Sequence, residues 1–294
     1  MIHYSNCPVC KSNSIAPVFS AKDYTVSNEL FEIWECDHCT LRFTQNIPIQ
    51  ENIGKYYQAT SYVSHTDSKE GGINKLYHVV RSFTLYLKRL IVTRNAHVAK
   101  GSLLDIGSGT GAFLNTIHHA GWSVAGLEPD ELARKKSTEL YNITPGTPEK
   151  LFELKNSSYD VITMWHVLEH VHQLHEYIST IKKTLKLKGV LFIAVPNFTS
   201  FDANKYKELW AAYDVPRHLY HFSPKSMKVL LRTHGLVIDK IKPMWFDSFY
   251  VSMLSEQNKS GSLFIAFVIG CWSNVIAFFR KDKCSSLIYV IKKA

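Results

Sequence analysis

One stretch of the chain restricts its fold more than any other. Residues 103–113 read Leu-Leu-Asp-Ile-Gly-Ser-Gly-Thr-Gly-Ala-Phe, an apolar run followed at once by three glycines at alternate positions. This pattern is typical of a strand, a tight turn and the start of a helix, where backbone N–H groups can approach a ligand closely. A glycine turn can also serve only to pack a helix against a strand, so the flanking sequence has to distinguish the two.

The flanking sequence repeats the alternation of strand and helix. Segments of helical periodicity separate near-continuous apolar runs, which are typical of parallel strands buried on both faces. We therefore predict an α/β fold with a doubly wound, mostly parallel sheet. Strands are expected at 102–106, 122–127, 159–164, 190–195, 236–241 and 286–292, and helices at 75–91, 110–120, 130–141, 174–189 and 224–235.

Two carboxylates indicate which ligand the glycine turn would hold. Asp105 directly precedes the turn, and Glu128 ends the next strand in Gly126-Leu127-Glu128-Pro129. A carboxylate before the turn would repel a pyrophosphate but suits a ligand that carries an ammonium group and a sulfonium. An acid at the end of the second strand can accept both ribose hydroxyls. The pair indicates S-adenosylmethionine rather than a nicotinamide dinucleotide.

Residues 101–294 resemble the class I S-adenosylmethionine-dependent methyltransferases. Besides the glycine turn and Gly126–Pro129, the matching pieces are 159–162, 167–170, 187–191 and 195–197. The resemblance implies a seven-stranded sheet in the order 3-2-1-4-5-7-6 with its last strand antiparallel. It also implies that Thr147 or Glu149 replaces an acid that many relatives place near the adenine amine. The candidate cofactor-binding residues are Asp105, Gly107, Gly109, Gly111, Glu128, Pro129, Thr147 and Trp165.

Four of the six cysteines form two Cys-x-x-Cys pairs. The pairs are Cys7 with Cys10 and Cys36 with Cys39, and together they can wrap a tetrahedral zinc ion. A redox dithiol needs only one pair, and an iron centre is the remaining alternative. Four thiolates leave no coordination position open, so the ion would be structural. We expect residues 1–45 to form a zinc ribbon, similar to the one that precedes some sugar C-methyltransferases and related bacterial methyltransferases.

A first group of candidate acceptor-site residues follows the fourth strand. His166, Glu169 and His170 would lie in the crevice at the carboxyl ends of the strands, where ligands bind in doubly wound folds. Related quinone O-methyltransferases carry Glu-x-x-Glu-His here and are thought to bind a metal. The alternative is that Glu169 and His170 only brace the start of a helix.

A second group lies in an expected acceptor insertion at 197–222. Zinc-ribbon sugar C-methyltransferases use a Glu-His pair as the base at the matching place, whereas this chain has Arg217-His218. The histidine base would therefore be present while its acidic partner is absent. Arg217 would suit a phosphate or carboxylate on the acceptor. Alternatively both residues only brace the sheet. His218 is the first candidate for the catalytic base and His166 the second.

Two further segments are expected around the catalytic residues. Residues 46–100 would form a helical lead-in whose Tyr56, Tyr57, Tyr62 and His65 either form a lid over the pocket or serve only the packing of the lead-in itself. Residues 249–280 would form an apolar helical insertion. Its most apolar part, 262–279, barely reaches spanning length and is followed by basic residues. We expect it to pack on the domain or a partner, with contact to a membrane surface as the alternative.

Charge and targeting signals narrow the classes of function. The net charge of +9 favours acidic partners, but the basic residues are scattered and none of their short runs is typical of a nucleic-acid-binding arm, so a nucleic-acid partner is not expected. No secretory signal precedes Cys7, and we expect a cytoplasmic protein.

The leading hypothesis is methyl transfer from S-adenosylmethionine to a small acceptor. A saccharide or nucleotide-sugar derivative is the first choice of acceptor, and a quinone-like lipid at the membrane surface is the second. An RNA-binding or RNA-modifying protein is the competing class. However, residues 164–167 read Met-Trp-His-Val where base amino methylation would require Asn/Asp-Pro-Pro-Tyr/Phe. A non-catalytic scaffold that binds the cofactor is a third class.

Overall fold

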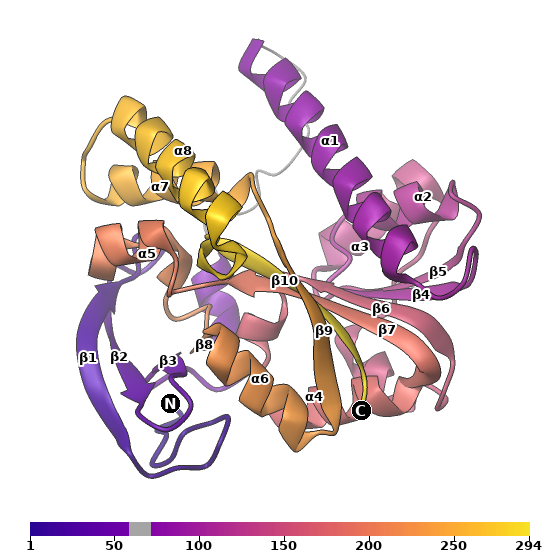
Figure 1. The fold of residues 1–294 in the computed structure, drawn as a ribbon, viewed down its shortest axis with the longest axis horizontal. Helices are drawn as coiled ribbons and strands as arrows, with labels where there is room; N and C mark the ends of the chain where they lie inside the picture. Colours follow the sequence, from indigo (N-terminus) through magenta and orange to yellow (C-terminus); the bar gives the residue numbers. More distant parts are fainter. Residues whose placement is uncertain (59–71) are drawn as a thin grey trace.

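The computed structural model describes residues 1–58 and 72–294, and of 72–79 only the backbone. A central sheet of six strands runs in the order β5-β4-β6-β7-β10-β9, and β10 is antiparallel to both of its neighbours (Figure 1). The predicted mostly parallel, doubly wound α/β class is confirmed. The strands are β4 (Ser102–Ile106), β5 (Ser123–Leu127), β6 (Tyr159–Trp165), β7 (Leu185–Pro196), β9 (Leu236–Pro243) and β10 (Ser286–Lys293).

The predicted third strand of the sheet does not form. In its place a single parallel bridge joins Gly146 to Leu127 at the edge of β5. Pro145 and Pro148 flank that bridge, and proline has no N–H group to contribute to a ladder. The described sheet therefore has six strands in the expected order rather than seven.

Helices cover both faces of the sheet. They are needed on both because successive side chains of each strand point to opposite faces and both sets are apolar. Leu103 and Phe192 point toward α1 (Gly72–Asn95) and α2 (Ala112–His118), and α3 (Glu131–Tyr141) lies beside α2. Leu104 and Ile193 point toward α4 (Leu174–Thr184) and α6 (Pro224–Thr233) on the opposite face. The glycine turn between β4 and α2 therefore lies at the carboxyl edge of a sheet covered on both sides.

The helix α4 ends earlier than the sequence pattern predicts. It ends at Thr184 rather than at Gly189, and β7 begins at once with Leu185, which pairs with Tyr159. Gly189 lies inside β7, where an added Cβ would come within 2.7 Å of the Leu185 side chain. The glycine permits this close approach within the strand and does not stop the helix.

A second, antiparallel sheet lies at the N-terminus. Its strands are β1 (Ile15–Lys22), β2 (Leu30–Cys36), β3 (Arg42–Thr44) and β8 (Tyr220–His221). The last of these comes from the expected acceptor insertion, which also contains α5 (Phe201–Tyr206). The segment next to His218 is thus held by the N-terminal sheet.

The expected apolar insertion forms a helical hairpin between β9 and β10. Its helices are α7 (Asp247–Asn258) and α8 (Leu263–Phe279), which pack against each other. Among the described helices, none combines the length and apolarity that crossing a membrane requires.

Candidate functional site

The glycine turn has the backbone conformation that a close-fitting ligand site requires. Gly107, Gly109 and Gly111 all have positive φ angles, of 74°, 53° and 78°, which L side chains rarely adopt. A Cβ on Gly107 would collide with Val167, and one on Gly111 with Ser137, whereas one on Gly109 would meet nothing within 4 Å. The outer two glycines are therefore required by packing, and the middle one borders open space in which a ligand fits.

Glu128 fixes the turn to the neighbouring strand. Its carboxylate accepts hydrogen bonds from the N–H groups of Gly109, at 2.7 Å, and Asp130, at 2.9 Å. The residue is 8% exposed, and burial raises its pKa. Each carboxylate oxygen has a further lone pair, so Glu128 can hold the turn and still accept ribose hydroxyls. Pro129 follows it directly.

Asp105 is buried beneath the turn. It accepts a 2.6 Å hydrogen bond from the Thr163 hydroxyl, and burial raises its pKa to about 7. The Lys88 ammonium group approaches from α1 and lies 4.6 Å above the Trp165 ring, close enough to Asp105 to lower the pKa of that carboxyl. Negative, aromatic and positive groups thus surround the space at which the methionine end of S-adenosylmethionine is expected, and they fit its ammonium, sulfonium and carboxylate groups.

The expected adenine contacts, Thr147 and Glu149, lie at the start of the turn that follows Gly146, which is bridged to Leu127 at the end of β5. Thr147 is partly exposed and caps the short 3-10 turn Pro148–Glu153. Its side chain hydrogen-bonds to Glu149, which lowers the pKa of that carboxyl. Contact of either residue with adenine stays a prediction.

His166 is held as a cation between two acids. Its Nε2 lies 3.0 Å from Asp247 and its Nδ1 lies 3.4 Å from Glu169. Burial opposes the charge, but these two carboxylates outweigh it and raise the pKa of His166 to about 10. At neutral pH the ring has no free lone pair, and the geometry therefore disfavours His166 as the catalytic base.

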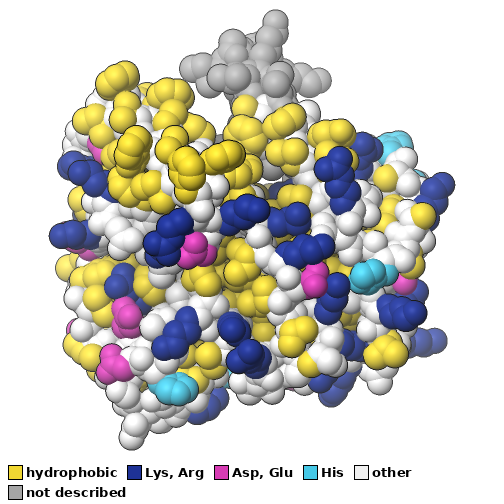
Figure 2. Space-filling model, in the orientation of Figure 1, with side chains coloured by type: hydrophobic (Ala, Val, Ile, Leu, Met, Phe, Trp, Pro, Cys, Tyr) yellow, Lys and Arg dark blue, Asp and Glu magenta, His cyan; other side chains and the backbone are white. Residues whose placement is uncertain are grey.

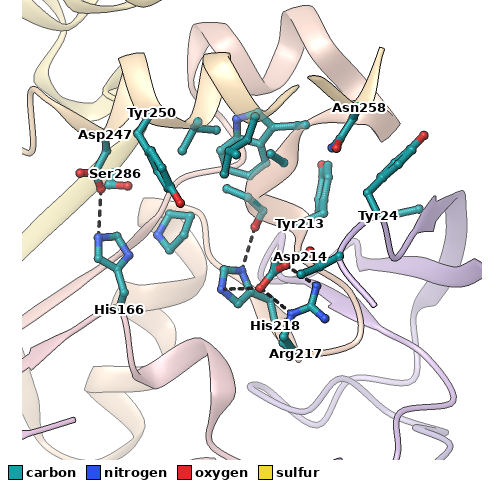
Figure 3. Close-up of a pocket in the computed structure, with 18 of the residues that line it drawn as sticks. Tyr24, His166, Tyr213, Asp214, Arg217, His218, Asp247, Tyr250, Asn258 and Ser286 are labelled. Carbon is teal, nitrogen blue, oxygen red and sulfur yellow. Dashed lines mark hydrogen bonds and ion pairs between the residues drawn. The ribbon is translucent and has the colours of Figure 1, made fainter. Parts of the chain in front are cut away.

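His218 has the opposite arrangement. Its Nδ1–H donates a 2.8 Å hydrogen bond to the Ala212 carbonyl, so the lone pair of the neutral ring is on Nε2. Nε2 lies 3.9 Å from the Asp214 carboxylate, which stabilises the imidazolium that forms when the ring takes a proton (Figure 3). The acidic partner expected to be missing is thus supplied by a residue four positions earlier in the chain.

Arg217 is not placed to bind an acceptor anion, contrary to that expectation. Its side chain is 1% exposed and donates to both oxygens of Asp214, at 3.0 and 2.6 Å. Further bonds run to Asp23, at 3.0 Å, and to the Tyr56 carbonyl, at 2.8 Å. Because two carboxylates already neutralise the guanidinium, Arg217 braces Asp214 and the N-terminal sheet instead.

The residues that could bind a metal ion here also differ from the expected set. The ligand atoms of Glu169, His170 and His218 all lie within 4.8 Å of one another, and His166 is outside that set. Glu169 is fully buried, and among the described residues its carboxylate has the 3.4 Å ion pair with His166 but no hydrogen bond. Burial and the neighbouring His218 lower the pKa of His170 to about 4. Two imidazole nitrogens and one carboxylate at this spacing could hold a divalent cation.

One residue of the lead-in reaches this group. The Tyr57 hydroxyl lies 3.0 Å from the Nδ1 atom of His170, whereas Tyr56 is buried and donates to Glu29 at 2.6 Å. Tyr62 and His65 lie outside the described residues. Of the expected covering residues, Tyr57 is thus the one placed beside the histidines.

A cavity of about 850 Å³ opens in front of these histidines. His166, His170, His218, Asp214 and Asp247 line one end of it, and α7 and the segment before His218 supply a wall that combines apolar side chains with Glu208, Gln257 and Asn258 (Figure 3). A cavity with polar groups at one end and an apolar wall suits an amphipathic small molecule. The apolar wall includes Trp210, Ala212, Tyr250, Val251, Met253 and Leu254.

Comparison with known proteins identifies the family. A family model described as a methyltransferase domain matches residues 80–241, more than half of the chain. The chain belongs to this methyltransferase family. The prediction of a class I S-adenosylmethionine-dependent methyltransferase is thereby confirmed.

Two curated relatives of this methyltransferase are named ubiquinone biosynthesis O-methyltransferases. The one from Bartonella bacilliformis is 30% identical over 155 residues, which are 47% of this chain and 61% of the relative. The one from Rickettsia canadensis is 22% identical over 203 residues, or 63% of this chain and 84% of the relative. The chain thus aligns with less than two thirds of the Bartonella protein's length.

Two solved structures share the fold of this methyltransferase. An S-adenosylmethionine-dependent methyltransferase from Archaeoglobus fulgidus has a TM-score of 0.50 at 21% identity, covering 73% of this chain and 94% of its own. The geranyl diphosphate C-methyltransferase of Streptomyces coelicolor has a TM-score of 0.53 at 14% identity, covering 78% and 88%. At such low identities they support the fold alone.

The methyltransferase also gathers its four N-terminal cysteines into one cluster. Their Sγ atoms lie within 4.8 Å of one another, and the Cys7–Cys39 and Cys10–Cys36 pairs are each 3.5 Å apart. Zn–S bonds of about 2.3 Å in a tetrahedron place sulfurs about 3.8 Å apart. The donor set and spacing therefore fit zinc, which we propose as the bound ion.

The residues that sequence reasoning missed come from segments remote from the motifs. Lys88 and Arg81 are seven residues apart on α1, and Arg81 donates to the Thr110 hydroxyl at 3.4 Å. Helical spacing places them on one face, but only the structure shows that this face adjoins the glycine turn. Asp247 likewise stands in no recognisable motif, and Asp214 lies in the segment that was singled out for His218 but was given no role there.

The raised pKa of Asp105 predicts a pH-dependent cofactor affinity. A positively charged ligand favours the ionised carboxylate, so affinity should fall as the pH drops through about 7, by up to about tenfold per pH unit. Calorimetry with S-adenosylmethionine between about pH 6 and pH 8 measures this. Asp105→Asn is the matched control, because titration of the ligand's own amine remains. Equal pH profiles for the two proteins would refute the role of Asp105.

Proposed function

We propose that this enzyme methylates a hydroxyl group on a small amphipathic acceptor, such as a phenol that carries an apolar tail. The observation that carries the proposal is the cavity in front of His218, in which a free imidazole nitrogen faces a space with an apolar α7 wall. An acceptor with a hydroxyl at the polar end and a tail along α7 would contact both the imidazole nitrogen and the apolar wall. The names of the curated relatives add support, since ubiquinone itself combines an oxygenated ring with an apolar tail.

One set of residues would bind the cofactor, and another would act on the acceptor. S-adenosylmethionine supplies an electrophilic methyl group. Asp105, Lys88 and the loop glycines Gly107 and Gly109 would hold its methionine end, and Glu128 would bind its ribose. His218 would take the acceptor proton at Nε2, with Asp214 stabilising the charge that results. Alignment of the acceptor oxygen at about 3–3.5 Å from the methyl carbon would supply most of the remaining rate.

The saccharide acceptor is less well supported. It rested on the resemblance to sugar C-methyltransferases, whereas the curated relatives are named for ubiquinone. The pocket provides apolar side chains such as Val251, Met253 and Leu254, for which a sugar has little use. An RNA acceptor is not favoured either, because the proposed base is 9% exposed inside a cavity.

A methyl-transfer assay tests the proposal. The protein is incubated with methyl-labelled S-adenosylmethionine and, separately, with an alkyl-substituted catechol, a nucleotide sugar and bulk RNA. We expect label in an O-methyl ether of the catechol. Label only in the nucleotide sugar or only in RNA would overturn the proposal and point to the corresponding alternative.

A further inference from the structure

Helix α8 buries small side chains and exposes large apolar ones, which is the reverse of the usual arrangement in a helix that faces water. The side it buries consists mostly of small residues, namely Ala266, Gly270, Ser273 and Ala277 together with Ile269. Gly270 lies so close to α7 that an added Cβ would come within 2.6 Å of Phe249. The helix therefore uses its small residues to approach the protein and directs its large apolar side chains away from it.

Those large side chains form a continuous exposed surface, which we call the α8 face. Figure 2 shows it as a dense group of apolar side chains at one end of the molecule. Four of them are more than 60% exposed, an arrangement that is unfavourable in water. The α8 face comprises Leu263, Phe264, Ile265, Phe267, Val268, Trp272, Val275, Phe278 and Phe279.

Charge at the two ends of α8 indicates what covers this face. The helix itself has no charged residue, but exposed Lys259 precedes it and exposed Arg280 and Lys281 follow it. The acid among these flanking residues, Asp282, is half-buried and paired with Arg280 at 3.4 Å. An apolar face with basic residues at its ends complements lipid tails bordered by anionic headgroups.

The length of α8 determines how it would lie. Its 17 residues give a helix of roughly 25 Å, shorter than the roughly 30 Å hydrocarbon core of a bilayer. One side of it is also committed to α7. The helix can therefore lie in the plane of the membrane surface, with its apolar side chains inserted between the headgroups.

We propose that the α8 face binds the surface of an anionic lipid bilayer. Its partner helix α7 separates this face from the acceptor cavity, and Tyr250, Met253 and Leu254 of α7 line that cavity. The hairpin thus places the cavity next to the bilayer. This last step rests on the proposed function: an acceptor with an apolar tail would enter along α7 without crossing water.

Vesicle flotation tests this binding without any acceptor. The full-length protein is mixed with vesicles of phosphatidylcholine alone, or of phosphatidylcholine with phosphatidylglycerol. We expect binding to the anionic vesicles at least about tenfold tighter than to neutral ones. The double variant Phe264→Gln/Phe278→Gln should lose at least about tenfold in affinity for the anionic vesicles. Leu187→Gln, which alters an 80% exposed leucine on β7, should not.

Three outcomes would overturn the proposal. They are absence of the wild-type protein from the floated fraction, equal flotation of the double variant, and a dimer that the double variant dissociates while no vesicle binding occurs. The last would assign the α8 face to a second copy of the chain. Cofactor affinity should be the same in all variants. Since flotation involves no methyl transfer, its failure would leave the catechol assay unaffected, and failure of that assay would leave the flotation result standing.

Discussion

Replacement of His218 by alanine is expected to lower the turnover number by about 10²–10⁴, with cofactor affinity within a small factor of the wild type. The loss follows from removal of the histidine whose Nε2 carries the lone pair and lies 3.9 Å from Asp214, because its Nδ1–H is bonded to the Ala212 carbonyl at 2.8 Å. Steady-state kinetics with a methylated acceptor and calorimetry with S-adenosylmethionine measure the two quantities. Exposed His118, replaced in the same way, is the control.

Three patterns would assign the chemistry differently. Activity that disappears on removal of divalent cations, while the cysteine cluster keeps its zinc, would mean that Glu169, His170 and His218 act as metal ligands. A larger loss in His166→Ala than in His218→Ala would transfer the main role to the imidazolium between Asp247 and Glu169. If neither histidine matters, the acceptor is acidic enough to react by proximity alone.

Loss of zinc is expected to abolish acceptor methylation while S-adenosylmethionine still binds. Structural zinc contributes about 10–16 kcal/mol to the folding of small zinc modules, so Cys36→Ser should unfold the N-terminal sheet. That sheet includes β8 and holds the His218 carbonyl by a 2.7 Å hydrogen bond from Thr44. The glycine turn and Glu128 lie on the central sheet. Unfolding should therefore reach His218 and spare the cofactor site.

Metal analysis, turnover and calorimetry on one preparation examine this prediction. We expect one zinc per chain, no turnover in Cys36→Ser, and normal cofactor affinity. Cys271→Ser is the matched control, since Cys271 is a free thiol outside the cysteine cluster. Zinc-free protein with full turnover would contradict the coupling between the N-terminal sheet and His218.

The parts of the fold that depend on local sequence could be predicted. The glycine turn requires positive φ at Gly107, Gly109 and Gly111, and three such glycines between an apolar strand and a helix leave few alternatives. The cysteine cluster is equally local, because each Cys-x-x-Cys pair forms its own turn. The strand expected at Gly146 does not form, and the reason is present in the sequence, because prolines stand on both sides of this residue.

The acceptor site could be predicted only in part, because its groups meet through long-range packing. Asp247 reaches His166 from a helix 81 positions later in the chain, and Asp23 binds Arg217 from the N-terminal sheet. Asp214 stands beside His218 in the sequence, yet its role depends on an irregular backbone that periodicity does not reveal. The sequence pattern therefore suggested the histidines but not the acids that set the charge of His166 and support His218.

A crystal structure with bound S-adenosylhomocysteine tests the central claim most directly. The account predicts ribose hydroxyls on Glu128, the methionine end between Asp105 and Lys88, and the sulfur directed toward the cavity in front of His218. The distance from the His218 Nε2 atom to the sulfur should leave room for one acceptor oxygen and the methyl group between them. A ligand whose sulfur points away from that cavity, or that binds elsewhere, would contradict the account.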